Sequence, residues 1–280
     1  MALALVDALL LAFGALQLGW LFGGSRALAL AGVTVAEYAR HGFFELLAVA
    51  ALALPLLLVA TARVGADAQA VGHALEARRL RRHFRLAAGA LVALVLVLLV
   101  SALDRMRLYR DVFGLTEARL YATAFLVWLG VVCAWAGATL LRDRPAHFAL
   151  GTLASAWIGV LALDALDPDA RIVRTNVARA AAGQTFDVGY VTRLSADAVP
   201  ALVDDALPLV VRRGDPAEAC ALAHALRRAR TQAAAGRDWR TANVARARAA
   251  RVVAPLAASA VAPRCPAGPP SSSVPAASGD

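Results

Sequence analysis

Glu37, His41 and Glu45 recur at every fourth residue, which places them on one face of a helix. A histidine between two carboxylates could bind a metal ion or relay a proton. The same spacing also fits a charged stripe at the entry to a helical bundle, balanced by Arg40 or by arginines between residues 104 and 119. Metal sites usually need three or four ligands, and the apolar segments hold no second cluster of His and Glu. We therefore favour an ion-paired structural or gating cluster, with no metal and no cofactor.

Glu45 is the most informative member of this group because it lies inside an apolar segment. An ionised carboxylate in a membrane is costly unless it is paired or faces water, which makes it a candidate functional residue. The nearest rich source of cations is the stretch from Arg105 to Arg110. We expect the two regions to meet at one face of the membrane.

Arg105, Arg107 and Tyr109 lie at the end of another apolar segment. Guanidinium groups bind phosphate and carboxylate through paired hydrogen bonds, so this stretch could hold a lipid phosphate. The alternative is an interfacial anchor whose arginines pair with Asp104, Asp111 and Glu117, and we favour that interpretation. The candidate polar cluster thus comprises Glu37, Tyr38, Arg40, His41, Glu45, Arg105, Arg107 and Tyr109. No nucleophile–base pair and no phosphate-binding loop motif accompanies it, so the catalytic residues are unknown.

Five apolar segments must position these side chains, at residues 1–22, 43–62, 84–103, 120–141 and 147–166. Each is about long enough to cross a hydrocarbon core as a helix. Of the 280 residues 60% are hydrophobic, and the mean hydropathy of +0.62 is too high for an ordinary soluble protein. The formal net charge is +9, and all 29 basic side chains behind it are arginines, since the chain contains no lysine. Because the arginines flank apolar segments or are scattered, we expect no nucleic-acid partner.

The rest of the chain reads as short amphipathic helices near 170–182, 196–207, 216–235 and 238–257, followed by a Pro/Ser/Gly/Ala-rich end. The sequence therefore predicts an all-α protein: a membrane bundle of about five helices (1–166), a small C-terminal helical domain (167–260) and a disordered tail (261–280). Gly151, Ser155 and Gly159 form a stripe of small residues that permits close helix packing, either within the bundle or between two copies of the chain.

Several blocks of this sequence resemble a bacterial membrane protein family known as domain of unknown function 4173. The block from Val33 to Leu46 is similar to the family signature TYAEYARRGFFEL, and further matching blocks begin at Ser101, Asp167, Leu194 and Asp238. The resemblance implies a multi-pass protein of the bacterial inner membrane with a helical C-terminal region and no assigned activity. Family members carry further spans upstream, so the chain resembles their C-terminal half. The family pattern has Arg where this chain has His41, which argues against a metal ligand there, and Trp where it has Ala242.

Three functions are compatible with these features. The first is a non-enzymatic scaffold or complex subunit in contact with the lipid bilayer, whose C-terminal domain binds a protein partner. The second is a transporter-like module with Glu45 on its path, and the third is an enzyme acting on a lipid-linked anionic substrate. We favour the first.

The orientation of the chain in the membrane is hard to predict, because similar numbers of arginines flank both sides of the predicted bundle. The densest group is Arg78, Arg79, Arg81, Arg82 and Arg85, which is hard to translocate. We therefore predict that residues 63–85 are cytoplasmic and that the C-terminal domain is extracytoplasmic. In an oxidising compartment a bond between Cys220 and Cys265 would be allowed, although the two lie far apart in the sequence without a recognisable motif and we favour two unrelated thiols.

Overall fold

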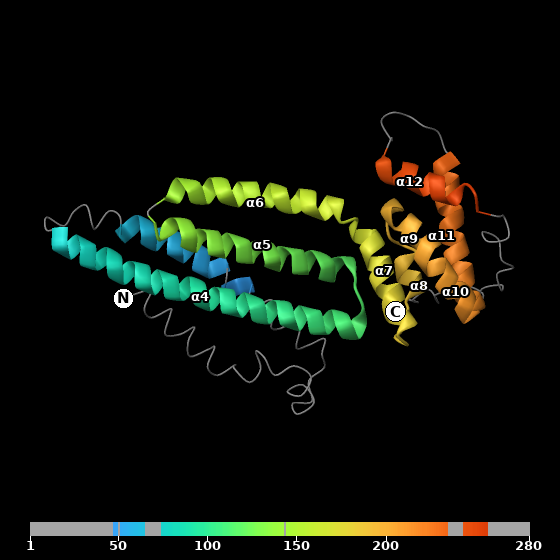
Figure 1. Cartoon of the computed structure of the whole chain (residues 1–280), viewed down its shortest axis with the longest axis horizontal. Coiled ribbons are helices and arrows are strands. Elements are labelled where there is room, and N and C mark those ends of the chain that lie inside the picture. Colours follow the sequence, from blue (N-terminus) through green and yellow to red (C-terminus); the bar gives the residue numbers. More distant parts are fainter. Residues whose placement is uncertain (1–46, 50, 65–73, 143, 235–242, 257–280) are drawn as a thin grey trace, which may run out of the picture. The chain divides into compact units, whose positions relative to one another are not determined.

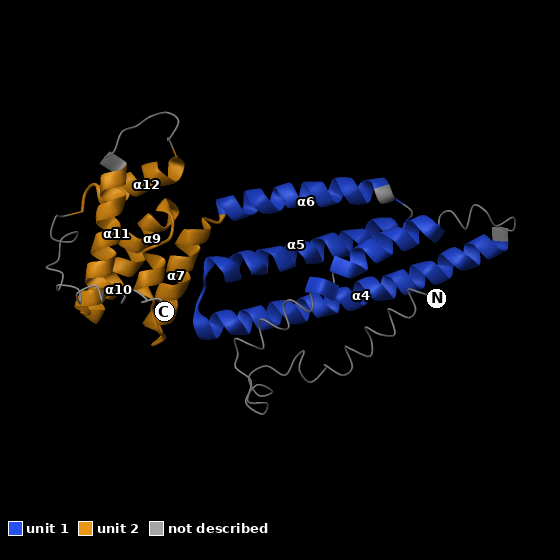
Figure 2. Ribbon diagram, turned by 180° about the vertical axis from the view of Figure 1, so that it is seen from behind, with its two compact units in different colours: residues 1–165 blue, residues 166–280 orange. Residues whose placement is uncertain are grey.

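The computed structural model describes residues 47–49, 51–64, 74–142, 144–234 and 243–256 (Figure 1). These residues are helical or lie in short connections, and none of them forms a strand, so the predicted all-α class is confirmed. The chain divides into two compact units, Met1–Ala165 and Leu166–Asp280 (Figure 2). The predicted spans at residues 1–22 and the predicted disorder of 261–280 lie outside the described residues.

The first unit contains four helices that are long and apolar enough to cross a membrane. They are Leu47–Val64, α4 (Ala74–Phe113), α5 (Glu117–Leu140) and α6 (Pro145–Ala165). Helix α4 packs along α5, and α5 packs along α6 (Figure 1). These four correspond to the second to fifth apolar segments of the sequence.

Helix α4 is longer than its apolar segment requires. Its 40 residues span about 60 Å at 1.5 Å per residue, about twice the thickness of a hydrocarbon core. The sequence predicted loops at 63–85 and 104–119, and much of both is helical instead. The connection to α5 is only three residues long, because Gly114 adopts a left-handed conformation (φ 79°) that ends α4 and Thr116 caps α5 through the backbone N–H of Arg119.

Apolar side chains fill the space between Leu47–Val64, α4 and α5. One cluster centres on Leu91, Leu98 and Leu126, and a second on Leu57 and Ala136. Cys133 lies in the first cluster as a buried free thiol and packs there among leucine and valine side chains. In a bilayer such packing between helices depends on close fit rather than on exclusion of water.

Small residues of α6 bring it close to α5. A Cβ atom at Gly151 would collide with the indole ring of Trp135, whose Nε1 donates to the carbonyl oxygen of His147 at 3.0 Å. One turn later, Trp128 Nε1 donates to Ser155 Oγ at 3.3 Å. A Cβ at Gly159 would meet no atom within 4 Å. Two members of the predicted stripe therefore pack within the chain.

The second unit is built from short helices around one core. In chain order they are α7 (Pro168–Ala181), α8 (Val188–Val191), the 3₁₀ helix η1 (Ala196–Ala198), α9 (Val199–Ala201), the π-helical turn η2 (Leu202–Ala206), α10 (Leu207–Arg213), α11 (Pro216–Ala234) and α12 (Val244–Val253). The fully buried residues at the centre of the core include Val173, Leu222, Leu226 and Val253. The predicted helix at 216–235 matches α11 closely, whereas α8 was not predicted.

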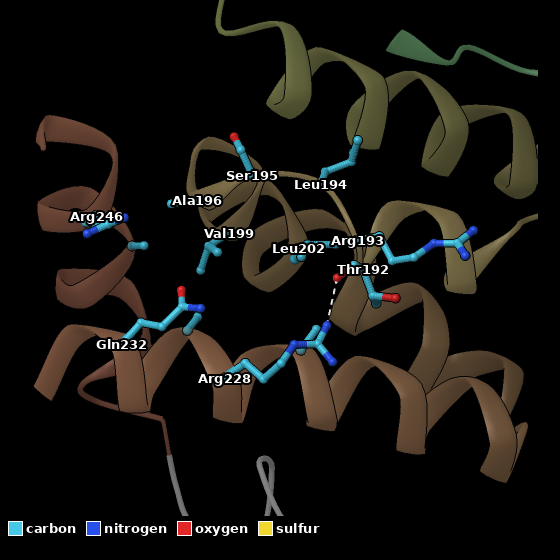
Figure 3. A pocket seen from close by; sticks show the side chains of 13 residues that line it. Thr192, Arg193, Leu194, Ser195, Ala196, Val199, Leu202, Arg228, Gln232 and Arg246 are labelled. Carbon is cyan, nitrogen blue, oxygen red and sulfur yellow. Dashed lines mark hydrogen bonds between the residues drawn. The ribbon is translucent and has the colours of Figure 1, made fainter. Parts of the chain in front are cut away.

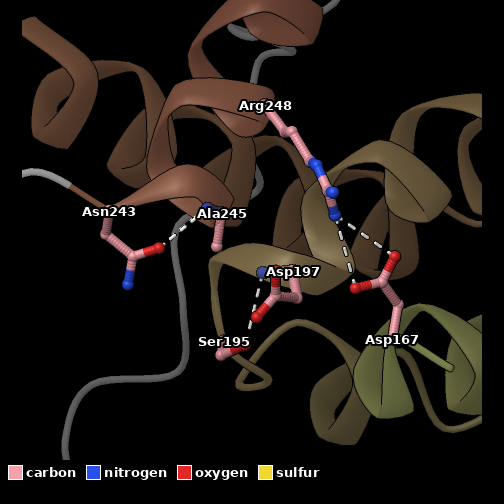
Figure 4. Close-up of polar contacts among 6 residues, drawn as sticks. All are labelled: Asp167, Ser195, Asp197, Asn243, Ala245 and Arg248. Atoms are coloured by element: carbon pink, nitrogen blue, oxygen red, sulfur yellow. Dashed lines mark hydrogen bonds and ion pairs between the residues drawn. The ribbon is translucent and has the colours of Figure 1, made fainter. Parts of the chain in front are cut away.

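Polar side chains fix the ends of these helices (Figure 4). Ser195 accepts from the N–H of Asp197 at 3.2 Å, and Asn243 accepts from the N–H of Ala245 at 2.7 Å. Arg248 of α12 reaches back to Asp167 at the start of α7, with 3.3 Å between Nη1 and Oδ2. Because that ion pair joins residues 81 positions apart, it ties the last described helix to the first helix of the unit.

Candidate functional site

The predicted polar cluster is only partly within the described residues. Glu37, Tyr38, Arg40, His41 and Glu45 lie outside them, so the shared helix face and its meeting with the arginine stretch stay predictions. Arg105, Arg107 and Tyr109 lie in the last three turns of α4. The site can therefore be built from the α4–α5 end of the first unit.

Arg105 continues the buried face of α4. Leu98 and Ala102 point the same way from the preceding two turns, and only 7% of the Arg105 surface is exposed. Ser101, one turn before Arg105, is completely buried. Both side chains have interaction partners in the structure, although the Nε and Nη2 atoms of Arg105 are buried without a hydrogen bond to a described residue. Arg105 thus places a positive charge against the interior of the helical bundle.

Arg107 and Arg110 lie on the outer side of the same helix end and pair with neighbouring carboxylates. Arg107 Nη1 lies 3.1 Å from Asp104 Oδ1, and Arg110 Nε lies 3.7 Å from Asp111 Oδ1. Both pairs are exposed and contribute little to stability, since water screens such charges. They do agree with the interfacial anchor interpretation, which assigned Asp104 and Asp111 as partners of these arginines.

Tyr109 belongs to an aromatic and cationic group that the sequence analysis did not identify. Its ring meets Phe113 edge to face, with 5.1 Å between ring centroids, and the Arg119 guanidinium carbon lies 4.2 Å from the Tyr109 centroid. Arg119 Nη1 also donates to the carbonyl oxygens of Phe113 at 2.9 Å and Gly114 at 2.6 Å. Arg119 therefore caps the carboxyl end of α4, where a cation is favoured by the helix dipole.

The contact between Arg119 and Tyr109 is not evident from the sequence, because Arg119 follows ten positions later in a charged stretch that resembles a loop. The signal that could have identified it is the pair of Gly114 and Thr116, which indicates a tight turn. A turn that short brings the first turn of α5 beside the last turn of α4. Within the described part of the chain, no three His, Cys, Asp or Glu side chains gather as metal ligands.

Comparison with known proteins places this chain in a family. The family model for DUF4153, a domain of unknown function, matches residues 1–204. The chain belongs to the DUF4153 family. An unassigned family was therefore predicted correctly, whereas its identity as domain 4173 is not confirmed. No curated protein and no solved structure matches the chain.

The DUF4153 match contains the whole α4–α5 end, including Arg105, Tyr109 and Arg119. It stops at residue 204, within η2. Helices α10, α11 and α12 therefore lie beyond the part of the chain that the DUF4153 family model matches.

Proposed function

We propose that this protein is a non-enzymatic scaffold or complex subunit of the bacterial inner membrane. In this proposal residues 1–166 form the membrane bundle, and a helical domain at 167–260 binds a protein partner. The membrane part rests on helices long and apolar enough to cross a bilayer.

The observation that carries the proposal is the internal use of the polar side chains at the α4–α5 end. Arg107 and Arg110 pair with carboxylates of their own helix, and Arg119 is bonded to the carbonyl oxygens of Phe113 and Gly114. The charges of Arg107 and Arg110 are offset by carboxylates, and Arg119 is used to cap the end of α4, so these contacts are explained without a bound phosphate. These contacts support a structural role for the segment over the lipid-linked substrate site considered above.

Arg105 is the residue on which a transporter-like function would depend, because it is charged and faces the bundle interior. We propose instead that it belongs to a structural ion pair with Glu45, as expected from the cost of an isolated carboxylate in lipid. Glu37, Tyr38, Arg40 and His41 would surround this pair at the same membrane face.

Charge exchange between the two positions tests this function. Arg105→Gln and Glu45→Gln should each lower the thermal unfolding midpoint of the full chain in detergent, since breaking a buried pair costs about 3–5 kcal/mol. The double exchange of Glu45→Arg with Arg105→Glu should recover at least half of that loss, because the pair is restored with its charges reversed. Arg107→Gln is the matched control and should have little effect. A double exchange that is as unstable as the two single changes added together would contradict the structural pair.

We also propose that the C-terminal domain is extracytoplasmic. Cys220 is disulfide-bonded, while Cys133 is a free thiol and Cys265 lies outside the described residues. Structural disulfides form in oxidising compartments, and the arginine-dense start of α4 favours the cytoplasmic side for the opposite end of the bundle. A homo-oligomer through the α6 stripe would have to use Gly159, because Gly151 and Ser155 are occupied by α5.

A further inference from the structure

The second unit contains a cavity of about 350 Å³ between α11, α12 and the segment from Thr192 to Val199 (Figure 3). This volume lies near the lower end of the range of about 300–1,000 Å³ typical of small-molecule sites. Its walls come from three separate stretches of the chain, so the cavity exists only when the unit is folded. Nothing in the proposed scaffold function uses it.

Three arginines line this cavity: Arg193, Arg228 and Arg246. The other polar side chains on its wall are uncharged, and no carboxylate is among the lining residues. Across the described residues, none of the three arginines forms an ion pair with an acidic side chain. A cavity lined by cations without acidic partners attracts an anion.

The arginines differ in how they are placed. Arg228 projects from α11 and donates through Nη2 to the carbonyl oxygen of Thr192 at 3.0 Å (Figure 3). That bond uses one of the five N–H donors of the guanidinium and holds the side chain against the cavity wall. Arg246 lies on the α12 wall with Gln232 of α11 below it, whereas Arg193 extends away from both (Figure 3). Arg228, held beside Thr192, is therefore the cation expected to contact the anionic group, and Arg246 lies across the cavity from it (Figure 3).

The remaining wall is apolar, which limits the kind of anion that fits. Ala225 and Ala229 lie one turn apart on α11, and their small side chains leave the space that larger residues would fill. Val199 and Leu202 close the cavity on the side of α9 and η2. A ligand that fills this space needs a compact apolar body as well as an anionic group.

We propose that this cavity binds a small organic anion with a phosphate or carboxylate group and a compact apolar body. The guanidinium group of Arg228 holds the oxygens of the anion through charge-assisted hydrogen bonds. Arg246, on the α12 wall, adds positive charge at the other side of the cavity. The alanines of α11 with Val199 and Leu202 contact the apolar body. This site is independent of the scaffold function and of the α4–α5 end.

Binding to the full chain in nanodiscs of zwitterionic lipid tests the proposal, with phenyl phosphate as the probe in isothermal titration. Inorganic phosphate and benzyl alcohol are the matched probes for the anionic and apolar parts, and benzoate distinguishes a carboxylate from a phosphate preference. We expect phenyl phosphate or benzoate to bind at least tenfold more tightly than either partial probe. Absence of binding by both phenyl phosphate and benzoate, or equal affinity for inorganic phosphate, would overturn the proposal.

Variants then locate the site. Arg228→Gln should weaken binding of the preferred probe by about tenfold, the value of one charge-assisted hydrogen bond. Because Arg228 also donates to the carbonyl oxygen of Thr192, circular dichroism checks that this variant is folded, and Arg228→Lys, which keeps the charge, should recover part of the affinity. Arg230→Gln on α11 and Arg251→Gln on α12 are matched controls outside the cavity lining and should bind like the original chain. Binding by folded Arg228→Gln that equals that of the original chain, or an equal loss in the two controls, would place the ligand elsewhere.

Discussion

Arg119 shows how one side chain can define the end of a membrane helix. It contacts two backbone carbonyls of α4 and the ring of Tyr109 from a position in α5. Carbonyls at the end of a helix have no partner within the helix, and in a membrane they cannot rely on water throughout. Arg119 supplies that partner and so joins α4 to α5.

Replacing Arg119 with Ala should therefore destabilise the bundle by roughly 1–3 kcal/mol, the combined value of its hydrogen bonds and cation–π contact. The stability of Arg119→Lys should lie between that of the original chain and that of Arg119→Ala, since lysine keeps the charge but loses the planar guanidinium group. Arg107→Ala is the control, and the loss of its exposed pair with Asp104 should cost at most about 1 kcal/mol. Thermal unfolding in detergent measures all three. Equal midpoints for Arg119→Ala and Arg107→Ala would show that the cap has no effect.

The sequence could not distinguish Arg105 from Arg107, although the structure gives them opposite environments. Both lie in a charged stretch that looks like a loop, and a loop has no buried face. Once α4 is known to continue to Phe113, the helical period places Arg105 in line with Leu98 and Ala102 and turns Arg107 outward. The missing information was the helix boundary, not the chemistry of either arginine.

At the scale of helices, the α5–α6 contact depends on the absence of a side chain at Gly151. The Trp135 indole occupies the space where a Cβ would stand, and its bond to the His147 carbonyl keeps it there. Gly159 lies two turns further along α6 with open space beside it. A side chain is therefore excluded at Gly151 and tolerated at Gly159, so the two glycines can serve as test and control.

Gly151→Ala should destabilise the first unit by roughly 1–3 kcal/mol, because the indole must move and lose its hydrogen bond. Gly159→Ala should be neutral or stabilising by up to about 1 kcal/mol, as expected for alanine at a helical position where a Cβ meets no other atom. Resistance of each variant to unfolding in a denaturing detergent, followed by tryptophan fluorescence, provides the comparison. If Gly151→Ala and Gly159→Ala resist unfolding equally well, α5 and α6 do not pack closely at Gly151.

Helices were predictable where local signals mark their ends. Ser195 caps η1, and Asp215 accepts from the N–H of Ala217 at 2.8 Å at the start of α11, both at positions expected from the sequence. The polar ends of α4 were not predictable from hydropathy, because a helix that leaves the membrane continues with charged residues. The π-helical turn η2 and the short α8 depend on packing against the core of the second unit and leave no local pattern.

At the scale of the whole molecule, two units with different composition share one chain. The first has helices with exposed apolar faces, as on α6, where Trp157, Ile158 and Leu161 are largely exposed. Such a face is stable in lipid and not in water. The second has a conventional buried core and charged helix surfaces. The exposed apolar helices therefore indicate that the first unit lies in the bilayer, and we predict that the second unit lies in an aqueous compartment.

Reporter fusions at residues 75 and 260 test this placement most directly. Alkaline phosphatase is active only outside the cytoplasm, so each fusion reports the side of the membrane that its position reaches. We predict an inactive enzyme at residue 75, where the arginine-rich start of α4 stays in the cytoplasm, and an active enzyme at residue 260, after the C-terminal domain. Activity at 75 together with none at 260 would contradict the account.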